Sequence, residues 1–133
     1  MDKRNETEEV FQRIIGDSMA MKLMKSRISK AARFPWPVLI LGESGVGKEL
    51  TARAIHDLGP RREAPFVPVN CAGMPDTLVE SEFFGYEKGA FTDAKSEKMG
   101  KFQEANTGTI FLDEIGEATV KFQVTLLRVL ETG

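Results

Sequence analysis

The sequence predicts an α/β domain with a parallel sheet, and three observations support this fold class. The first is the apolar run 38–41, an uninterrupted stretch typical of parallel strands that are covered on both faces. The second is the glycine-rich stretch 42–49, which follows that run and leads into a helical pattern. The third is a second strand-like run, 109–112, which ends in the carboxylate pair Asp113-Glu114.

The stretch 42–49 has the spacing of a phosphate-binding P-loop, G-x-x-x-x-G-K-[ST], in every position but the last. It consists of Gly42, Glu43, Ser44, Gly45, Val46, Gly47, Lys48 and Glu49. Glycines let several backbone N–H groups point into one concavity, and the N-terminus of the following helix adds positive charge there. Lys48 can then reach the outer phosphates of a nucleotide. The alternative, a glycine-rich turn with a chance lysine, is disfavoured by the strand before it and the helix after it.

Composition places the chain among ordinary globular domains. It has 133 residues, of which 41% are hydrophobic and 29% charged, with a formal net charge of −2. No compact cluster of Lys and Arg indicates a nucleic-acid surface. The single cysteine, Cys71, cannot form an internal disulfide, which fits a reducing cytoplasm. No signal peptide or membrane-spanning run is found, so we expect a cytoplasmic location and no membrane partner.

The first half of the chain contains two predicted helices besides its strand. Residues 1–13 are predicted to be a polar leader to a domain at 14–133. A helix capped by Asp17 or Ser18 is expected to run to about Arg33, where a segment with two prolines ends it. The P-loop helix is expected at 47–58.

The second half alternates strands and helices. A strand is predicted at 66–70, at a sheet edge because Pro68 cannot donate a ladder hydrogen bond. A helix at 75–84, a polar excursion at 86–99 and a short helical piece at 101–105 follow. The last helix, at 118–131, is predicted to be amphipathic. Its apolar positions at helical spacing are Val120, Val124, Leu127 and Leu130 or Glu131.

The carboxylate pair Asp113-Glu114 is the second candidate for chemistry. Ligands of open parallel sheets bind beyond the carboxyl ends of the strands, where both this pair and the P-loop are expected. Asp113 could hold Mg²⁺, directly or through water, and Glu114 could orient the attacking water. The alternative is that the acids merely favour a helix N-terminus, which the presence of a P-loop upstream makes weaker.

Together these motifs resemble a known family. In order they are 42–49, Asn70-Cys71-Ala72, the run 80–85 (ESEFFG), the run 89–94 (GAFTDA) and the run 108–117 (GTIFLDEIGE). They resemble the AAA+ domain of bacterial enhancer-binding proteins, the NtrC-type activators of sigma-54 RNA polymerase. The resemblance runs from about Ile14 to the end of the chain. The P-loop of that family itself carries Glu where most P-loops carry Ser or Thr, so Glu49 fits.

The resemblance implies a role for each matched residue. Residues 42–48 would hold the phosphates of ATP, Asp113 would serve Mg²⁺, and Glu114 would activate water. Asn70 matches the residue that holds the catalytic glutamate away from water in this family; a turn-capping Asn is the alternative. Ile15 and Gly16 match the segment that packs on the adenine, and an ordinary helix entry is the alternative there.

The run 89–94 resembles the GAFTGA loop that contacts sigma-54. It consists of Gly89, Ala90, Phe91, Thr92, Asp93 and Ala94. Asp93 replaces the Gly of the family pattern, which adds a charge and removes a flexible position. An exposed Phe91 can supply much of a small protein interface, and folding of this ring into the core is the alternative.

Three further positions receive a structural interpretation. His56, the only histidine, has no partner at metal-ligand spacing. Cys71 is expected to be a small packed residue and not a nucleophile. Arg61-Arg62 is expected to be a solvated loop, and neither residue matches the arginine finger of the family.

The resemblance also implies what the 133 residues do not supply. In this family the chain continues to a sensor strand, arginine fingers, a helical lid and a DNA-binding helix-turn-helix, and a receiver domain of the two-component type can precede it. The family sheet has the strand order 5-1-4-3-2, of which this sequence supplies strands 1, 2 and 3. We therefore expect an incomplete sheet, direct pairing of strands 1 and 3, or a gap closed by another chain.

The favoured function is an ATP-binding AAA+ domain of a sigma-54-dependent regulator. In the complete protein a ring, hexamer or heptamer, would couple ATP hydrolysis to remodelling of sigma-54 RNA polymerase, and DNA would be bound only through a domain absent here. The fragment itself is expected to hydrolyse little and not to form a ring. One alternative is a non-hydrolysing interaction module or truncated remnant that binds sigma-54 or an activator ring. Another is a different P-loop NTPase, such as a kinase or transport ATPase.

Overall fold

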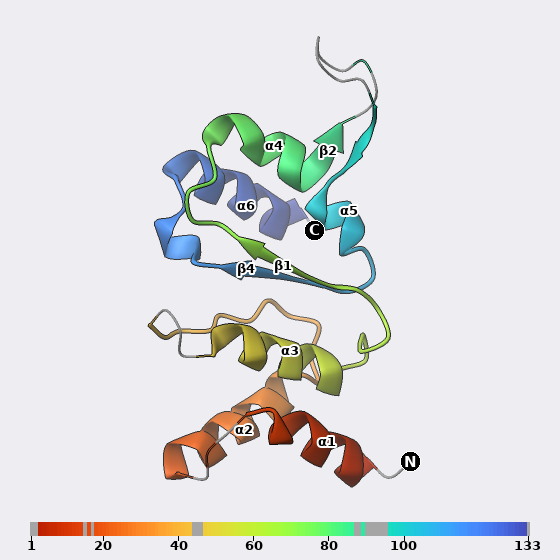
Figure 1. Cartoon of the computed structure of the whole chain (residues 1–133), viewed down its shortest axis with the longest axis vertical. Coiled ribbons are helices and arrows are strands. Elements are labelled where there is room, and N and C mark those ends of the chain that lie inside the picture. The colour runs from red at the N-terminus through yellow and green to blue at the C-terminus, as the bar shows by residue number, and fades with distance from the viewer. Residues whose placement is uncertain are drawn as a thin grey trace. The chain divides into compact units, whose positions relative to one another are not determined.

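The computed structural model describes residues 3–14, 16, 18–43, 47–86, 89 and 96–132. The chain divides into two compact units (Figure 1). The first comprises residues 1–66 with 107–109, and the second comprises 67–106 with 110–133. Each unit is described by itself.

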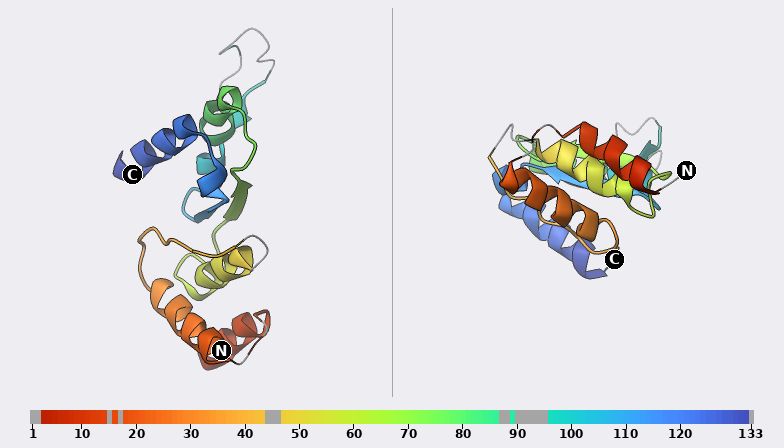
Figure 2. Two further views of the ribbon diagram at one scale, coloured as in Figure 1. Left: turned by 90° about the vertical axis from the view of Figure 1, so that its left-hand side faces the viewer. Right: turned by 90° about the horizontal axis from the view of Figure 1, so that it is seen from below.

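The described residues of the first unit form three helices. They are α1 (Lys3–Gln12), α2 (Met19–Ala31) and α3 (Lys48–Leu58). Both α1 and α2 contact α3 (Figure 2). Ser18 caps α2, because its hydroxyl oxygen accepts a hydrogen bond from the Met21 N–H at 3.2 Å. The helices expected to start near Ser18 and at the P-loop are thereby confirmed.

The segment predicted as a polar leader contains the helix α1. Its residues Val10 and Phe11 pack against a cluster formed by Ile14, Ile28 and Ala54. The side chain of Arg13, just after α1, also pairs with Asp57 on α3 at 3.3 Å. The apolar positions near the end of an otherwise polar segment therefore fasten it to the P-loop helix, which its overall composition did not indicate.

The prediction of a strand at 38–41 is wrong. Residues 35 and 37–43 have neither helix nor strand geometry, and the side chains of Leu39 and Leu41 are 74% and 84% exposed. A strand exists only when a neighbour completes its hydrogen bonds, and in the described part of the chain no strand pairs with this segment. Of the three expected outcomes, the incomplete sheet is the one observed.

The other two predicted strands are confirmed and pair with each other. They are β1 (Phe66–Asn70) and β4 (Thr109–Asp113). The Thr109 N–H donates to the Pro65 carbonyl and the Cys71 N–H donates to the Asp113 carbonyl, both at 2.9 Å, so the strands run parallel. Within the described residues β1 has β4 as its one neighbour, which agrees with the edge position expected from Pro68.

The second unit continues with short elements around this sheet. They are α4 (Asp76–Phe84), β2 (Gly85–Tyr86), β3 (Lys98–Met99), α5 (Lys101–Glu104), the 3₁₀ turn η1 (Ile115–Glu117) and α6 (Val120–Thr132). The strands β2 and β3 form an antiparallel pair at the base of the predicted excursion. This pair and η1 were not predicted, because two or three residues are too few to show a period.

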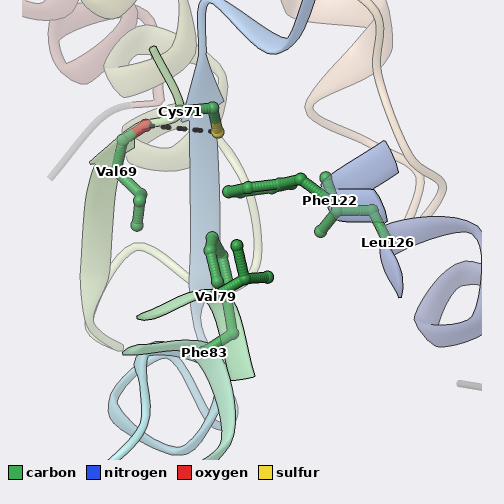
Figure 3. Packing of buried hydrophobic residues seen from close by; sticks show 6 residues of the cluster. All are labelled: Val69, Cys71, Val79, Phe83, Phe122 and Leu126. Atoms are coloured by element: carbon green, nitrogen blue, oxygen red, sulfur yellow. Dashed lines mark hydrogen bonds between the residues drawn. The ribbon is translucent and has the colours of Figure 1, made fainter. Parts of the chain in front are cut away.

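Side chains from β1, α4 and α6 form the core of the second unit (Figure 3). Val69 and Cys71 come from β1 and its end, Val79 and Phe83 from α4, and Phe122 from α6. The rings of Phe83 and Phe122 meet edge to face, with centroids 4.9 Å apart. The core thus fastens the two helices to the strand whose end carries candidate site residues.

The helix α6 lies where it was predicted, but a different face of it is buried. Phe122 and Leu126 are 0% and 7% exposed. The predicted apolar positions Val120, Val124, Leu127 and Leu130 are 76%, 44%, 57% and 62% exposed. The helix has two apolar stripes, and the stripe with the aromatic ring fills the core because it buries more apolar area.

None of the helices in the described part of the chain combines the length and the apolar character that crossing a bilayer requires.

Candidate functional site

The P-loop ends in a glycine conformation that directs the chain into α3. Gly47 is the N-cap of α3 and has φ 81° and ψ 28°, in the left-handed region that favours glycine. Lys48 is the first residue of the helix and is half-buried, so its side chain starts at the helix N-terminus. Gly42 and Glu43 are exposed, and Ser44, Gly45 and Val46 lie outside the described residues.

Glu49, at the position where a P-loop has a hydroxyl, is held by an arginine one turn further along α3. Its Oε1 accepts hydrogen bonds from Arg53 Nε at 3.1 Å and Arg53 Nη2 at 3.0 Å. The nearest hydroxyl in the helix is that of Thr51, and it donates to the Gly47 carbonyl at 3.2 Å. The spacing of Glu49 and Arg53, four residues apart on a helix, is the signal that could have found this pair from sequence.

The structural interpretation of His56 is confirmed. The side chain is buried, and its Nε2 donates to the Ala64 carbonyl at 3.0 Å. With that tautomer, Nδ1 accepts a hydrogen bond from the Thr109 hydroxyl at 2.8 Å. His56 therefore fastens α3 to the loop before β1 and to the start of β4.

The carboxylate pair lies at the end of β4, within the second unit. Asp113 is the last residue of the strand, and its Oδ1 accepts a hydrogen bond from the Glu114 N–H at 2.9 Å. Glu114 has φ 55° and ψ 41°, an uncommon conformation for a residue with a side chain. Both side chains are half-buried and make further interactions. The strained turn fixes the direction in which the Glu114 side chain leaves the strand end.

Asn70 is brought to the same end of the sheet as Asp113. The two residues end adjacent parallel strands, and the Cys71 N–H joins the Asp113 carbonyl. The side-chain Oδ1 of Asn70 accepts a hydrogen bond from the Ala72 N–H at 2.9 Å, which is the turn-capping contact weighed from sequence. To hold Glu114 back from water, Asn70 would have to use its amide nitrogen, and this hydrogen bond is not what the turn-capping contact shows. The role of Asn70 toward Glu114 therefore stays a prediction.

The carboxylate of Asp113 suits Mg²⁺ only if a bound nucleotide supplies further oxygen ligands. Magnesium at nucleotide sites takes one or two carboxylates and completes its shell with phosphate oxygens and water. Among the described residues, no group of three or more His, Cys, Asp or Glu side chains could hold a metal ion. The P-loop belongs to the first unit and Asp113-Glu114 to the second.

The predicted excursion at 86–99, which contains 89–94, is bounded by a braced pair of short strands. The pairs Gly85–Met99 and Tyr86–Lys98 form the antiparallel β2–β3 ladder, and an ion pair joins Lys98 to Glu82 on α4. Gly89 has φ 83°. The predicted contact residues Ala90, Phe91, Thr92, Asp93 and Ala94 lie outside the described residues.

Of the two residues predicted to pack on adenine, Gly16 alone is described. It has φ 134°, and its carbonyl accepts a hydrogen bond from Lys25 Nζ at 3.2 Å. Ile15 lies outside the described residues.

Cys71 is a packed residue, as expected from sequence. Its side chain is 1% exposed, and its Sγ lies 4.0 Å from the Val69 carbonyl oxygen (Figure 3). Burial, together with the negative charge of Asp113, raises the pKa of the Cys71 thiol from 9.0 to about 11. A thiol that stays protonated near neutral pH is a poor nucleophile.

Residues 14–133 match the protein family described as the Sigma-54 interaction domain. The response regulator protein PilR of Pseudomonas aeruginosa is 52% identical over 128 residues, which cover 95% of this chain and 29% of that protein. The Nif-specific regulatory protein of Azorhizobium caulinodans is 55% identical over 120 residues, which cover 90% of this chain and 20% of that protein. The chain thus spans less than a third of the length of these relatives.

Solved structures of NtrX from Brucella abortus are also similar. One has a TM-score of 0.78 at 36% identity and covers 97% of this chain and 26% of that one. A complex of NtrX with ATP has a TM-score of 0.75 at 37% identity and covers 87% of this chain and 24% of that one. The α/β fold class of AAA+ type predicted from sequence is confirmed.

Proposed function

Because the chain belongs to the family of Sigma-54 interaction domains, we propose that it binds ATP through its P-loop as part of a sigma-54-dependent transcriptional regulator. The observation that carries the proposal is the turn at Gly47, which directs Lys48 into the N-terminus of α3. A helix N-terminus preceded by a glycine loop favours phosphate, and a lysine there adds a full positive charge. The complex of the similar NtrX with ATP supports the same ligand.

In the proposed site each carboxylate has a separate task. Asp113 would hold Mg²⁺ together with phosphate oxygens of ATP, and the ion would supply positive charge against those phosphates. Glu114 orients the water that attacks the γ-phosphate and accepts its proton, which yields ADP and inorganic phosphate. Ile15 and Gly16 pack on the adenine, and Asn70 holds Glu114 back from that water. For the whole regulator we propose that hydrolysis in a ring drives remodelling of sigma-54 RNA polymerase in the cytoplasm.

Calorimetric titration of the chain with ATP and Mg²⁺ tests the nucleotide site. We expect measurable binding, and we expect Lys48→Ala to weaken it at least about 10-fold, because a charge-assisted contact to phosphate is lost. Lys22→Ala is the matched control, since Lys22 is an exposed lysine on α2 of the same unit. Equal affinities of the wild-type chain and Lys48→Ala would contradict the proposed site.

The second part of the proposal is that the run 89–94 contacts sigma-54. The braced β2–β3 pair supports it, because a segment whose two ends are held by a fixed ladder can reach a partner at lower entropic cost. Fluorescence anisotropy with labelled sigma-54 should show that Phe91→Ala weakens binding, whereas Met99→Ala, an exposed apolar side chain on β3, should not. A loss of binding in both variants or in neither would contradict a contact through this run.

A further inference from the structure

Glu49 poses an electrostatic difficulty for a phosphate-binding loop. It is the second residue of α3, next to Lys48, at the end of the helix that would receive the phosphates. A carboxylate there repels a triphosphate and competes with it for the positive helix end. Something in the chain must therefore neutralise this carboxylate or direct it away from the loop.

Arg53 meets both requirements. It donates two hydrogen bonds to Glu49 Oε1, at 3.1 and 3.0 Å, so that the carboxylate faces a full positive charge. Arg53 lies one turn further along α3, so pairing with it draws the Glu49 side chain down the helix and away from the helix N-terminus.

The guanidinium group of Arg53 is itself held in place. Its central carbon lies 4.5 Å from the centre of the Phe66 ring, within the range of a cation–π contact. The Phe66 ring in turn meets the ring of His56, with centroids 5.5 Å apart. An exposed ion pair on a free helix is mobile, whereas this arginine rests on the first residue of β1.

We propose that Arg53 is a positioning residue of the nucleotide site, which holds the Glu49 carboxylate away from the phosphates so that the loop accepts MgATP. The inference rests on the proposed ATP binding. Arg53 acts through Glu49 and does not itself touch the nucleotide. This positioning of Glu49 by Arg53 would explain how a P-loop with an acidic residue in its last position can still bind a triphosphate.

A double-mutant cycle tests the inference. Calorimetry measures the affinity for ATP with Mg²⁺ of the wild-type chain and of Arg53→Gln, Glu49→Gln and the double variant. We expect Arg53→Gln to weaken binding about 5-fold, because one unit of like charge is exposed to the phosphates at short range. The double variant should bind as tightly as Glu49→Gln alone, because the arginine then has no carboxylate to hold.

The matched control is Arg27→Gln, which removes the same charge from an exposed position on α2. Circular dichroism melts of each variant separate a loss of folding from a loss of affinity. Unchanged affinity of Arg53→Gln, with ATP binding to the wild-type chain, overturns this inference alone. A loss that persists in the Glu49→Gln background also overturns it, because Arg53 would then contact the nucleotide. Absence of ATP binding to the wild-type chain overturns the proposed function and, with it, this inference.

Discussion

Cys71 belongs to the core of the second unit, and its backbone N–H is bonded to the candidate site residue Asp113. The raised pKa of the Cys71 thiol, about 11, means that at pH 8 the thiolate fraction is about 100-fold lower than for a thiol of pKa 9.0. We expect a disulfide reagent to modify Cys71 of the folded chain very slowly at pH 8 and rapidly after unfolding in guanidinium. Fast modification of the folded chain would show that the side chain is accessible.

The same shift makes stability depend on alkaline pH. Because the folded pKa is above the unfolded value, the contribution of the thiol is fully present below pH 9.0 and is lost as pH rises to about 11. Denaturant titrations should show a larger loss of stability between pH 8 and about pH 10.5 for the wild-type chain than for Cys71→Ala. Equal losses would contradict the raised pKa.

Asn70 allows its two proposed roles to be separated by substitution. Asn70→Asp keeps an oxygen that can accept from the Ala72 N–H, whereas Asn70→Ala removes it. We expect Asn70→Ala to lower the free energy of unfolding by about 1 kcal/mol and Asn70→Asp to change it by less than about 0.5 kcal/mol. If the amide nitrogen restrains Glu114, both variants should change the rate of ATP hydrolysis in a complete regulator. Equal destabilisation by the two substitutions would exclude the turn-capping contact.

Candidate residues could be chosen from sequence where a motif implies the chemistry. The spacing of the P-loop points to Lys48, and the end of the strand points to Asp113-Glu114; their roles stay predictions. The hydrogen bond of His56 to Thr109 was not predictable, because the two residues lie far apart in the chain. The role inferred for Arg53 likewise depends on the Phe66 ring, which sequence spacing alone does not place beside it.

At the scale of elements, the base of the β2–β3 hairpin depends on a close backbone approach at Gly100. A Cβ atom added there would lie 2.3 Å from the Phe83 carbonyl oxygen and 2.4 Å from the Phe84 carbonyl carbon. We expect Gly100→Ala to lower the free energy of unfolding by about 1–3 kcal/mol, because the backbone must shift. Chemical denaturation measures the change.

The matched control is Gly116→Ala in the turn η1. A Cβ atom at Gly116 meets nothing within 4 Å, so this substitution should change stability by less than about 0.5 kcal/mol. A similar small effect of Gly100→Ala would mean that the hairpin base tolerates a side chain and is not closely packed.

Most elements were predictable, and the failures have physical causes. The helices α2, α3, α4 and α6 and the strands β1 and β4 lie close to their predicted bounds, because caps, prolines and apolar periods mark them locally. The segment 38–41 has the composition of a strand, but strand formation depends on a neighbour that the described chain does not provide. The choice of the buried face of α6 depends on Phe83, which is distant in sequence.

At the scale of the whole molecule, apolar side chains remain exposed on both units. The segment 38–41 exposes Leu39 and Leu41, and α6 exposes Leu127. The formal net charge of −2 gives little repulsion between copies of the chain. Exposed apolar surface of this kind favours association at high concentration.

Two neighbouring leucines of α6 give a direct test. We expect Leu127→Lys to reduce self-association in sedimentation velocity and to leave the melting temperature nearly unchanged, because Leu127 is 57% exposed. Leu126→Lys should unfold the second unit, because Leu126 is 7% exposed and a buried charge would lack a partner. The opposite order of effects would show that the predicted face, and not the observed one, is buried.

The parallel pairing of β1 with β4 has a consequence for how the chain folds. The Cys71 N–H bonds the Asp113 carbonyl across roughly forty residues of intervening chain. Closing such a loop costs conformational entropy before the contact adds any stabilisation. The helix α4, the β2–β3 ladder and α5 lie within that loop and make contacts between near neighbours. The β2–β3 ladder should therefore form early in folding, and the strand ends that carry Asn70 and Asp113 should meet last.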